Sequence, residues 1–308
     1  MKIIINPKYE YLREDILQIP KEFDKQTGEI LYEARNILKS VELGGIKVVI
    51  KSFHQPKFFN RIIYSFIRKS KALRSYLFSE KLLECNIPVP TPIACIIDSK
   101  NGLITNSYYI NKYEEADTVR ELMGGSVKGN EDLLNDFTDF LIHTHYQGIL
   151  HLDLSPGNIL FKKGSNGKYK FFLIDVNRMK LDTYVGMKEA SHNLRRLCTS
   201  SEISGYIARR YAQHKGWDIG KMERMVQHDS DRFFKKFFFH RAATRSKTPH
   251  IRLVILRFRL FLFIRVHFLS TQSKLSATFY QKEAFIYINY LKDYDFRKIF
   301  YPDYIGKH

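Results

Sequence analysis

The chain has 308 residues, of which 44% are hydrophobic and 14% aromatic, enough to bury a sizeable core in one bilobal unit or two modest domains. This composition excludes a disordered tail protein. The 50 Lys and Arg against 32 Asp and Glu give a net charge of +18, and a surface of that sign attracts polyanions.

The cysteines and the apolar runs indicate the compartment. Cys85, Cys95 and Cys198 lie far apart without CxxC spacing, which argues against a disulfide scaffold or cysteine zinc site and favours a reducing cytoplasm. The three consecutive apolar residues before Asn6 are too few for a signal-peptide core, so export is not expected. The most apolar run, residues 251–269, contains four arginines, so no spanning helix is expected.

Alternating and β-branched residues predict a β-hairpin near the N-terminus. Its strands are expected over residues 30–38 and 47–53, with Gly44-Gly45 between them. Residues 56–69 then place bulky apolar side chains at helical spacing among Lys and Arg, which predicts a basic aromatic helix. This helix either contacts a membrane or anionic glycolipid, or packs on the core with a solvated basic face.

The middle of the chain changes from strands to helices. After a helix over residues 72–85, strands are predicted over residues 93–97 and 103–113. A helix over residues 132–146 and a strand over residues 171–174 follow. This order predicts an α+β, bilobal, protein-kinase-like fold with a small β-rich N-lobe and a mainly helical C-lobe. The expected division is an N-lobe at 1–113, a C-lobe at 114–231 and a basic aromatic extension at 232–308.

Two motifs carry the strongest functional signal. The first is HLDLSPGN at residues 151–158, and the second is the apolar run FFLI that ends at Asp175. They resemble the kinase catalytic loop H-x-D-x-x-x-x-N and the metal-binding Asp that follows it. Phosphoryl transfer needs a carboxylate to orient and deprotonate the attacking hydroxyl, which predicts Asp153 as the base. Mg²⁺ needs oxygen ligands, which predicts Asn158 and Asp175, while His151 is expected to brace the loop.

A kinase also needs a lysine on a strand of its front lobe. Lys51 ends the run VVIK and is expected to contact the α- and β-phosphates of ATP. Glu80, the first acid after Lys51, is expected to hold its ammonium group from the following helix. A lysine at the end of a strand usually faces solvent, so this prediction depends on the two downstream motifs.

Several segments resemble the lipopolysaccharide kinases that phosphorylate Kdo or heptose, the Kdo/WaaP family of the protein-kinase-like superfamily. The resemblance spans residues 25–230, and the segments that carry it are residues 49–53, 60–72, 87–94, 153–160 and 174–179. It implies ATP as phosphate donor, with Mg²⁺, and a sugar hydroxyl of the lipopolysaccharide inner core as acceptor. The implied partners are Kdo-lipid A or a related glycolipid and the anionic inner-membrane surface.

The sequence departs from protein kinases at two places. No GxGxxG motif precedes Lys51, so the hairpin at residues 33–36 is expected to cover the phosphates with its backbone amides, Arg35 and Asn36. The triplet at Asp175 reads DVN instead of DFG, and no APE motif follows. Regulation by phosphorylation of an activation loop is therefore not expected.

Most of the excess positive charge lies in one C-terminal block. Residues 232–282 contain 12 Lys and Arg and no acid, interleaved with aromatic residues. Three interpretations stay open: binding to the anionic cytoplasmic leaflet, binding to nucleic acid, and a poorly ordered extension outside the kinase unit.

The leading hypothesis is a cytoplasmic kinase, peripheral on the inner membrane, without nucleic acid as a partner. One alternative is a RIO-like or aminoglycoside-phosphotransferase-like kinase with a protein or soluble acceptor. The other is a non-catalytic pseudokinase scaffold. The scaffold interpretation is opposed by the joint presence of the five kinase-type residues Lys51, Glu80, Asp153, Asn158 and Asp175.

Overall fold

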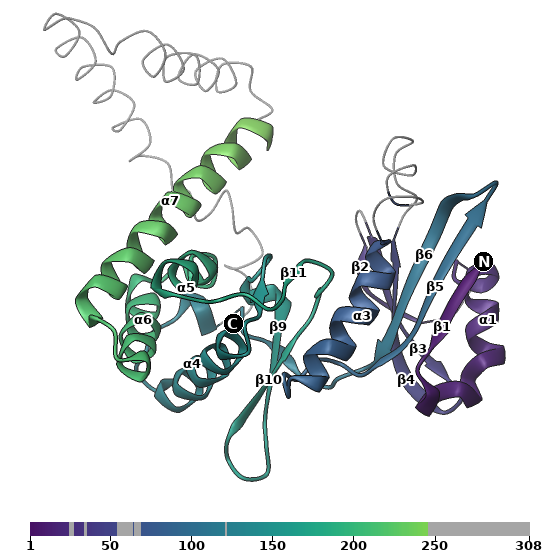
Figure 1. The fold of residues 1–308 in the computed structure, drawn as a ribbon, viewed down its shortest axis with the longest axis horizontal. Coiled ribbons are helices and arrows are strands. Elements are labelled where there is room, and N and C mark those ends of the chain that lie inside the picture. Colours follow the sequence, from purple (N-terminus) through teal and green to yellow (C-terminus); the bar gives the residue numbers. More distant parts are fainter. Residues whose placement is uncertain (25–27, 34–35, 54–63, 65–68, 121, 246–308) are drawn as a thin grey trace, which may run out of the picture. The chain divides into compact units, whose positions relative to one another are not determined.

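The structure is a computed structural model that describes residues 1–24, 28–33, 36–53, 64, 69–120 and 122–245 (Figure 1). The chain divides into two compact units, Met1–Phe237 and Phe238–His308. In the first unit an antiparallel sheet forms the N-terminal part and helices dominate the C-terminal part, as the α+β prediction requires. The boundaries at residues 113 and 231 stay predictions. The basic aromatic helix, apart from Tyr64 and Lys69, lies outside the described residues.

The N-terminal sheet has six strands within the described residues, in the order β1-β5-β6-β4-β3-β2, with antiparallel neighbours. They are β1 (Lys2–Ile5), β2 (Glu29–Glu33), β3 (Asn36–Leu43), β4 (Ile46–Phe53), β5 (Pro92–Lys100) and β6 (Leu103–Lys112). Gly44 and Gly45, at φ 52° and 80°, form the kind of two-residue turn that favours a tight hairpin. The predicted hairpin is confirmed, although the strand predicted over residues 30–38 is divided between β2 and β3.

Helical segments cover both faces of the sheet (Figure 1). They are η1 (Pro7–Leu12), α1 (Arg13–Glu22) and α3 (Lys71–Glu84). Alternate residues of β4 divide between the faces, since Val48 and Ile50 pack with α1 while Phe53 packs with Tyr76 of α3. Because side chains alternate along a strand, Lys51 projects from the same face as Phe53. The sheet therefore presents Lys51 on its α3 side.

The C-terminal part combines helices with short strands. Its elements are β7 (Asp117–Thr118), η3 (Leu122–Gly124), α4 (Glu131–Tyr146), β8 (Leu150–His151), η4 (Pro156–Asn158), β9 (Ile159–Lys163), β10 (Tyr169–Leu173), β11 (Met179–Lys180), α5 (Met187–Leu194), α6 (Ser201–Lys215) and α7 (Ile219–Arg245). The predicted helix over residues 132–146 and strand over residues 171–174 are confirmed as α4 and β10. None of the described helices combines the length and apolar character that crossing a bilayer requires.

One hydrophobic core extends from the end of α3 into the helical part. Leu82 and Ile87 belong to the same buried cluster as Phe137 of α4 and Tyr211 of α6. The backbone N–H of Leu173 donates to the carbonyl of Pro88 at 3.0 Å. These contacts fix the segment after α3 against β10, directly before the Asp175 motif.

Candidate active site

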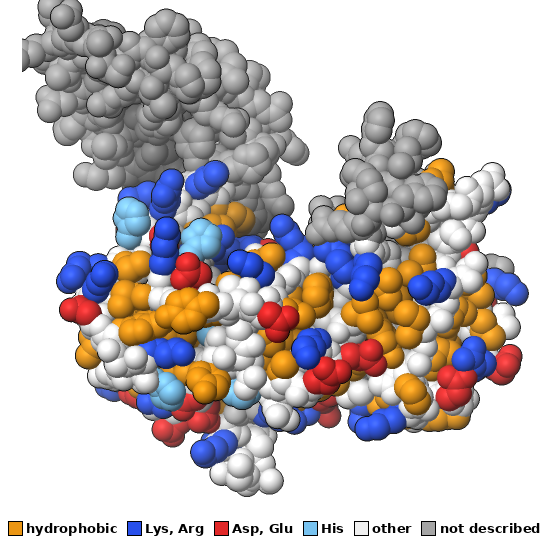
Figure 2. Space-filling view, in the orientation of Figure 1, with side chains coloured by type: hydrophobic (Ala, Val, Ile, Leu, Met, Phe, Trp, Pro, Cys, Tyr) orange, Lys and Arg blue, Asp and Glu red, His pale blue; other side chains and the backbone are white. Residues whose placement is uncertain are grey.

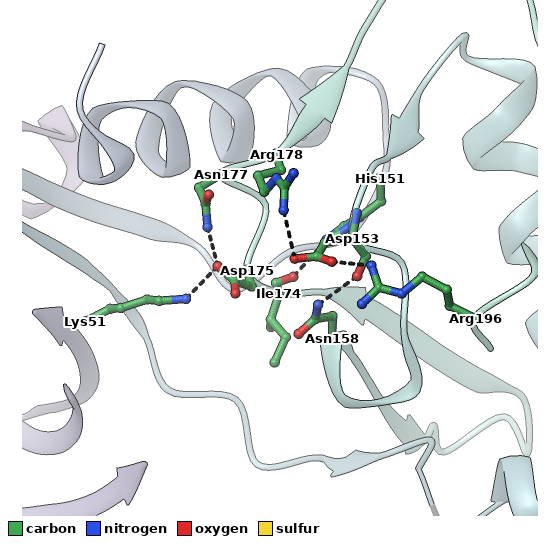
Figure 3. Close-up of polar contacts among 9 residues, drawn as sticks. All are labelled: Lys51, His151, Asp153, Asn158, Ile174, Asp175, Asn177, Arg178 and Arg196. Carbon is green, nitrogen blue, oxygen red and sulfur yellow. Dashed lines mark hydrogen bonds and ion pairs between the residues drawn. The ribbon is translucent and has the colours of Figure 1, made fainter. Parts of the chain in front are cut away.

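The two predicted motifs meet through a short antiparallel pair. β8 and β11 pair with His151 opposite Met179, and the N–H of Leu152 donates to the carbonyl of Arg178 at 2.9 Å. This pairing places the loop that begins at His151 beside the segment that contains Asp175 (Figure 3). The convergence expected from the sequence is therefore present in the fold.

His151 connects the two segments as a neutral, buried imidazole. Its side chain is 1% exposed, and burial lowers its pKa. Nδ1 accepts the backbone N–H of Asp153 at 3.1 Å, so the ring proton lies on Nε2, which donates to the carbonyl of Ile174 at 3.1 Å. His151 thus fixes the backbone of the predicted base and that of the residue before Asp175, as a bracing role requires.

Asn158 is oriented by its amide group. Nδ2 donates to the carbonyl of Asp153 at 2.9 Å, and the backbone carbonyl of Asn158 accepts the N–H of Ile174 at 3.0 Å. Because the amide nitrogen is engaged, the amide oxygen is the group left for a ligand.

Asp175 has a left-handed backbone with φ 54°, a conformation that Asp adopts more readily than most residues. Its Oδ1 accepts Lys51 Nζ at 2.6 Å and also the Asn177 side chain, whereas Oδ2 has no hydrogen-bond partner among the described residues. Burial raises the pKa of Asp175, but Lys51, His151 and Asn177 together outweigh it, so the pKa is lowered overall. The carboxylate is therefore charged at neutral pH, as a metal ligand must be.

The Lys51–Asp175 pair joins residues 124 positions apart. The two side chains are 11% and 33% exposed, so the charges are partly desolvated and attract each other more strongly than on an open surface. The pair brings a strand of the sheet to the Asp175 segment. Sequence reasoning assigned both residues to one phosphate site, and the structure places them in contact.

The remaining predicted site residues are less closely assembled. Glu80 lies near Tyr76, one turn earlier in α3, and burial together with Glu80 raises the pKa of the Tyr76 hydroxyl, while Lys51 pairs with Asp175. The Lys51–Glu80 pair therefore stays a prediction. Arg35 lies outside the described residues. Asn36 begins β3 opposite Phe53, two residues beyond Lys51 in register, so this end of the hairpin lies within about 7 Å of Lys51 along the strand.

Sequence reasoning missed two arginines that contact the predicted base. Arg196, which follows α5, donates to Asp153 Oδ1, and Arg178 Nη1 lies 3.7 Å from Asp153 Oδ2 (Figure 3). Arg178 is part of the segment that carries Asp175, but its type alone gave no role. Arg196 lies 43 positions from Asp153, and no local pattern connects the two.

A further arginine lies against the same loop. At Gly157 a Cβ atom would be only 2.5 Å from Nη2 of Arg120, which is closer than real Cβ contacts. Glycine therefore allows the guanidinium of Arg120 to approach the backbone between Asp153 and Asn158.

A buried hydrogen-bond chain supports the catalytic loop from behind. Asn193 of α5 donates its amide N–H to the His151 carbonyl at 2.9 Å, so its Oδ1 accepts from His145 Nε2 at 3.0 Å. His145 Nδ1 then accepts the hydroxyl proton of Tyr211 at 2.9 Å. Burial lowers the pKa of His145 to about 4, so the chain is neutral near pH 7. His145 is a buried residue of α4.

The donors at Asp175 and Asn158 fit Mg²⁺. Mg²⁺ prefers hard oxygen ligands and keeps several waters or phosphate oxygens in its shell, so one carboxylate and one amide oxygen suffice from the protein. Asp175 Oδ2 and the amide oxygen of Asn158 are of this kind, and both belong to one hydrogen-bonded unit. Lys51 beside them adds a cation suited to phosphate oxygens.

Comparisons with known proteins give a consistent result. The model of the family described as "Lipopolysaccharide kinase (Kdo/WaaP) family" matches residues 21–237, more than half of the chain. A solved structure titled "WaaP in complex with acyl carrier protein" is similar with a TM-score of 0.53 and 12% sequence identity. The similarity covers 77% of this chain and 99% of that one. At this identity the likeness shows a shared fold, which confirms the kinase-like prediction. No curated protein matches the sequence.

Proposed function

Because this chain belongs to the lipopolysaccharide kinase (Kdo/WaaP) family, we propose that it transfers the γ-phosphate of ATP to a hydroxyl of Kdo or heptose in the inner core. The observation that carries the proposal is the convergence of the two motifs with Lys51. The 2.6 Å Lys51–Asp175 pair lies beside the loop that holds Asp153 and Asn158 (Figure 3). A scaffold protein has no need of this arrangement.

In the proposed reaction Asp153 accepts the proton of the acceptor hydroxyl. The hydroxyl oxygen forms a bond to the γ-phosphorus, the bond from that phosphorus to the β,γ-bridging oxygen breaks, and its electrons leave with ADP. Lys51 binds phosphate oxygens and keeps the donor in place. Asn158 and Asp175 would hold Mg²⁺, which supplies neutralisation of phosphate charge. His151 takes no proton, because its Nδ1 is occupied by the Asp153 N–H.

The β2–β3 hairpin is proposed as the cover of the phosphates in place of a glycine-rich loop. The register of β3 and β4 supports this, since the hairpin end lies two residues beyond Lys51. Arg35 and the backbone amides near Asn36 would donate to phosphate oxygens. When ATP binds, the Lys51 ammonium is proposed to leave Asp175 and contact phosphate oxygens. Glu80 is then proposed to hold this ammonium group.

We propose that the reaction takes place at the cytoplasmic face of the inner membrane, where ATP and the growing glycolipid are both present. The net charge of +18 favours attraction to anionic lipid. On the face drawn in Figure 2, Lys and Arg side chains gather along the upper edge. The basic block at residues 232–282 is proposed to add to this attraction, although it lies largely outside the described residues.

The test is incubation of the full chain with ATP, Mg²⁺ and a panel of acceptors: Kdo-lipid A, a heptose-containing core lipid, an aminoglycoside and a generic protein. Mass spectrometry should find one added phosphate on a lipid acceptor, and none with Asp153→Ala or Asp175→Ala at unchanged circular dichroism. Phosphate on the aminoglycoside or protein instead would favour the alternative kinase classes. Activity that survives both substitutions would end the proposal.

A further inference from the structure

Both oxygens of the predicted base are held by cations. Arg196 donates to Asp153 Oδ1 and Arg178 approaches Oδ2 at 3.7 Å. Both carboxylate oxygens therefore face guanidinium groups, which occupy the space from which a hydroxyl would approach them. An acceptor hydroxyl gains access to Asp153 when one of the two arginines withdraws.

The cluster has more positive than negative charge. Asp153 is the acid that pairs with Arg178 and Arg196 among the described residues, so two cations share one anion. Neighbouring Arg195 is acted on by Arg196, which repels it, and by Asp229, which attracts it. Asp229 also accepts the hydroxyl proton of Ser191. The excess cation beside the base is available to a second anion.

The two arginines are held to different degrees. Arg196 is 27% exposed, and its guanidinium lies 5.2 Å from the ring centroid of Phe233 in α7. Its Nε is buried without a hydrogen-bond partner in the described structure. Arg178 is 59% exposed, and its 3.7 Å approach to Asp153 exceeds hydrogen-bond length. Arg178 therefore keeps donors free for another ligand, while Arg196 is anchored near them.

We infer that Arg178 and Arg196 form an acceptor subsite for an oxyanion on the sugar substrate, a carboxylate or a phosphate ester close to the reacting hydroxyl. The inference rests on the proposed function and adds the charge of the acceptor. Guanidinium groups bind both oxyanions through paired N–H donors. When the acceptor anion binds, Arg178 turns from Asp153 to it, and the carboxylate is released to accept the hydroxyl proton.

Through this exchange the site would select acceptors by their charge. A neutral sugar would leave both arginines on Asp153, so its hydroxyl would find guanidinium groups in front of both carboxylate oxygens. An acidic acceptor supplies the competing anion at the same position. A contact of this kind, between a charged donor and an anion, is worth roughly 10- to 100-fold in kcat/KM.

The test uses the full chain and three acceptors: native Kdo-lipid A, the same lipid with the Kdo carboxyls reduced to alcohols, and the same lipid without its phosphates. The wild type should phosphorylate one of the two altered acceptors about 10- to 100-fold less efficiently than the native one. The weaker acceptor identifies the anion that is bound. With Arg178→Gln the preference should shrink toward unity, and Arg178→Lys should restore part of it.

Controls separate binding from stability. Arg210, which pairs with Asp139 on the surface of the helical part, provides a matched variant, since Arg210→Gln should keep the wild-type preference. Arg196→Gln should lower the preference as Arg178→Gln does. If Arg196→Gln fails to fold, Arg178→Gln is the deciding variant, because the Arg178 side chain is largely exposed. Equal rates on all three acceptors, or a preference unchanged in Arg178→Gln, would overturn the subsite and leave the kinase assignment intact.

If the wild type phosphorylates none of these lipids, the proposed function fails and the subsite is judged separately. Saturation-transfer NMR with free Kdo, its methyl ester and inorganic phosphate as probes then compares the wild type with Arg178→Gln. Probe signals from an anion that vanish in Arg178→Gln and persist in Arg210→Gln support the subsite. Equal signals in all three proteins overturn it.

Discussion

His145 is the residue whose replacement has the most calculable effect. It lies in the buried chain that runs from Tyr211 through Asn193 to the backbone of His151. Burial lowers its pKa from 6.5 to about 4. The unfolded chain therefore binds a proton below pH 6.5 that the folded chain does not bind until about pH 4, so stability is full above pH 6.5 and is lost as the pH falls.

The size of the loss follows from the two pKa values. Between pH 7.5 and pH 5.0 the wild type should lose about 2 kcal/mol of unfolding free energy through His145 alone. His151, whose pKa is also lowered by burial, adds a loss of the same sign. In His145→Gln the amide can still donate to Asn193 and accept from Tyr211, but it does not titrate. We expect this variant to be about 1 kcal/mol less stable at pH 7.5 and to lose about 2 kcal/mol less on acidification.

Urea unfolding monitored by circular dichroism at pH 7.5 and 5.0 measures this difference. The control is His214→Gln, because His214 is an exposed residue of α6. It should lose as much stability as the wild type. If His145→Gln and the wild type show the same acid loss, the neutral buried imidazole is not what limits stability at low pH.

Three further substitutions test the site directly. Asp153→Asn removes the proposed proton acceptor and should lower kcat about 10²- to 10⁴-fold, while equilibrium dialysis should find ATP binding retained. Lys51→Met should lower kcat/KM for ATP about 10²- to 10³-fold, since it removes a cation from the phosphates, and steady-state kinetics with varied ATP would show it. Asn193→Ala leaves a carbonyl and an imidazole N–H buried without partners. It should cost about 2–4 kcal/mol of stability in urea unfolding, and a loss under 0.5 kcal/mol would contradict the hydrogen-bond chain.

The sequence predicted those helices and strands whose limits depend on residues close by in the chain. The helix α3 begins where Ser70 caps it by accepting the N–H of Leu73 and ends before Pro88, Pro90 and Pro92, so its limits follow from chemistry visible in the sequence. The turn of two glycines and the apolar alternation of β4 are local in the same sense. The contact between Lys51 and Asp175 was reached differently, from a resemblance of motifs rather than from periodicity.

The sequence analysis did not assign β1 and α1. β1 has four residues, which is too few for a periodic signal, and it is a strand because it pairs with β5 almost a hundred positions later. Pro20 lies inside α1 and would ordinarily argue against a helix there. Burial of Ile16 and Ile19 against the sheet outweighs that preference. Such elements depend on tertiary packing, which a single sequence does not display.

The arginines at Asp153 could not be predicted for a related reason. The 50 Lys and Arg residues give many possible ion-pair partners for each acid. Spacing along the sequence does not select among them, because Arg178 lies in a loop and Arg196 follows a helix, and only folding brings both to Asp153. The hydrogen-bond chain through Asn193 is equally non-local, with His145 and Tyr211 66 positions apart. The residues proposed for the chemistry and His151, which braces the loop, resembled a motif, whereas Asn193, His145 and Tyr211 behind the loop did not.

The backbone of the loop and the carboxylate of Asp153 are held by different kinds of contact. The backbone of the catalytic loop is held by neutral, buried hydrogen bonds from His151 and Asn193, which salt does not screen and no substrate replaces. The carboxylate of Asp153 is held by partly exposed ion pairs, which are individually weak and readily exchanged. If charged groups held the loop, an anionic acceptor would compete for them and displace the base together with its partners. Because the loop is held by neutral groups, the proposed acceptor would take Arg178 from Asp153 and find the carboxylate still in position.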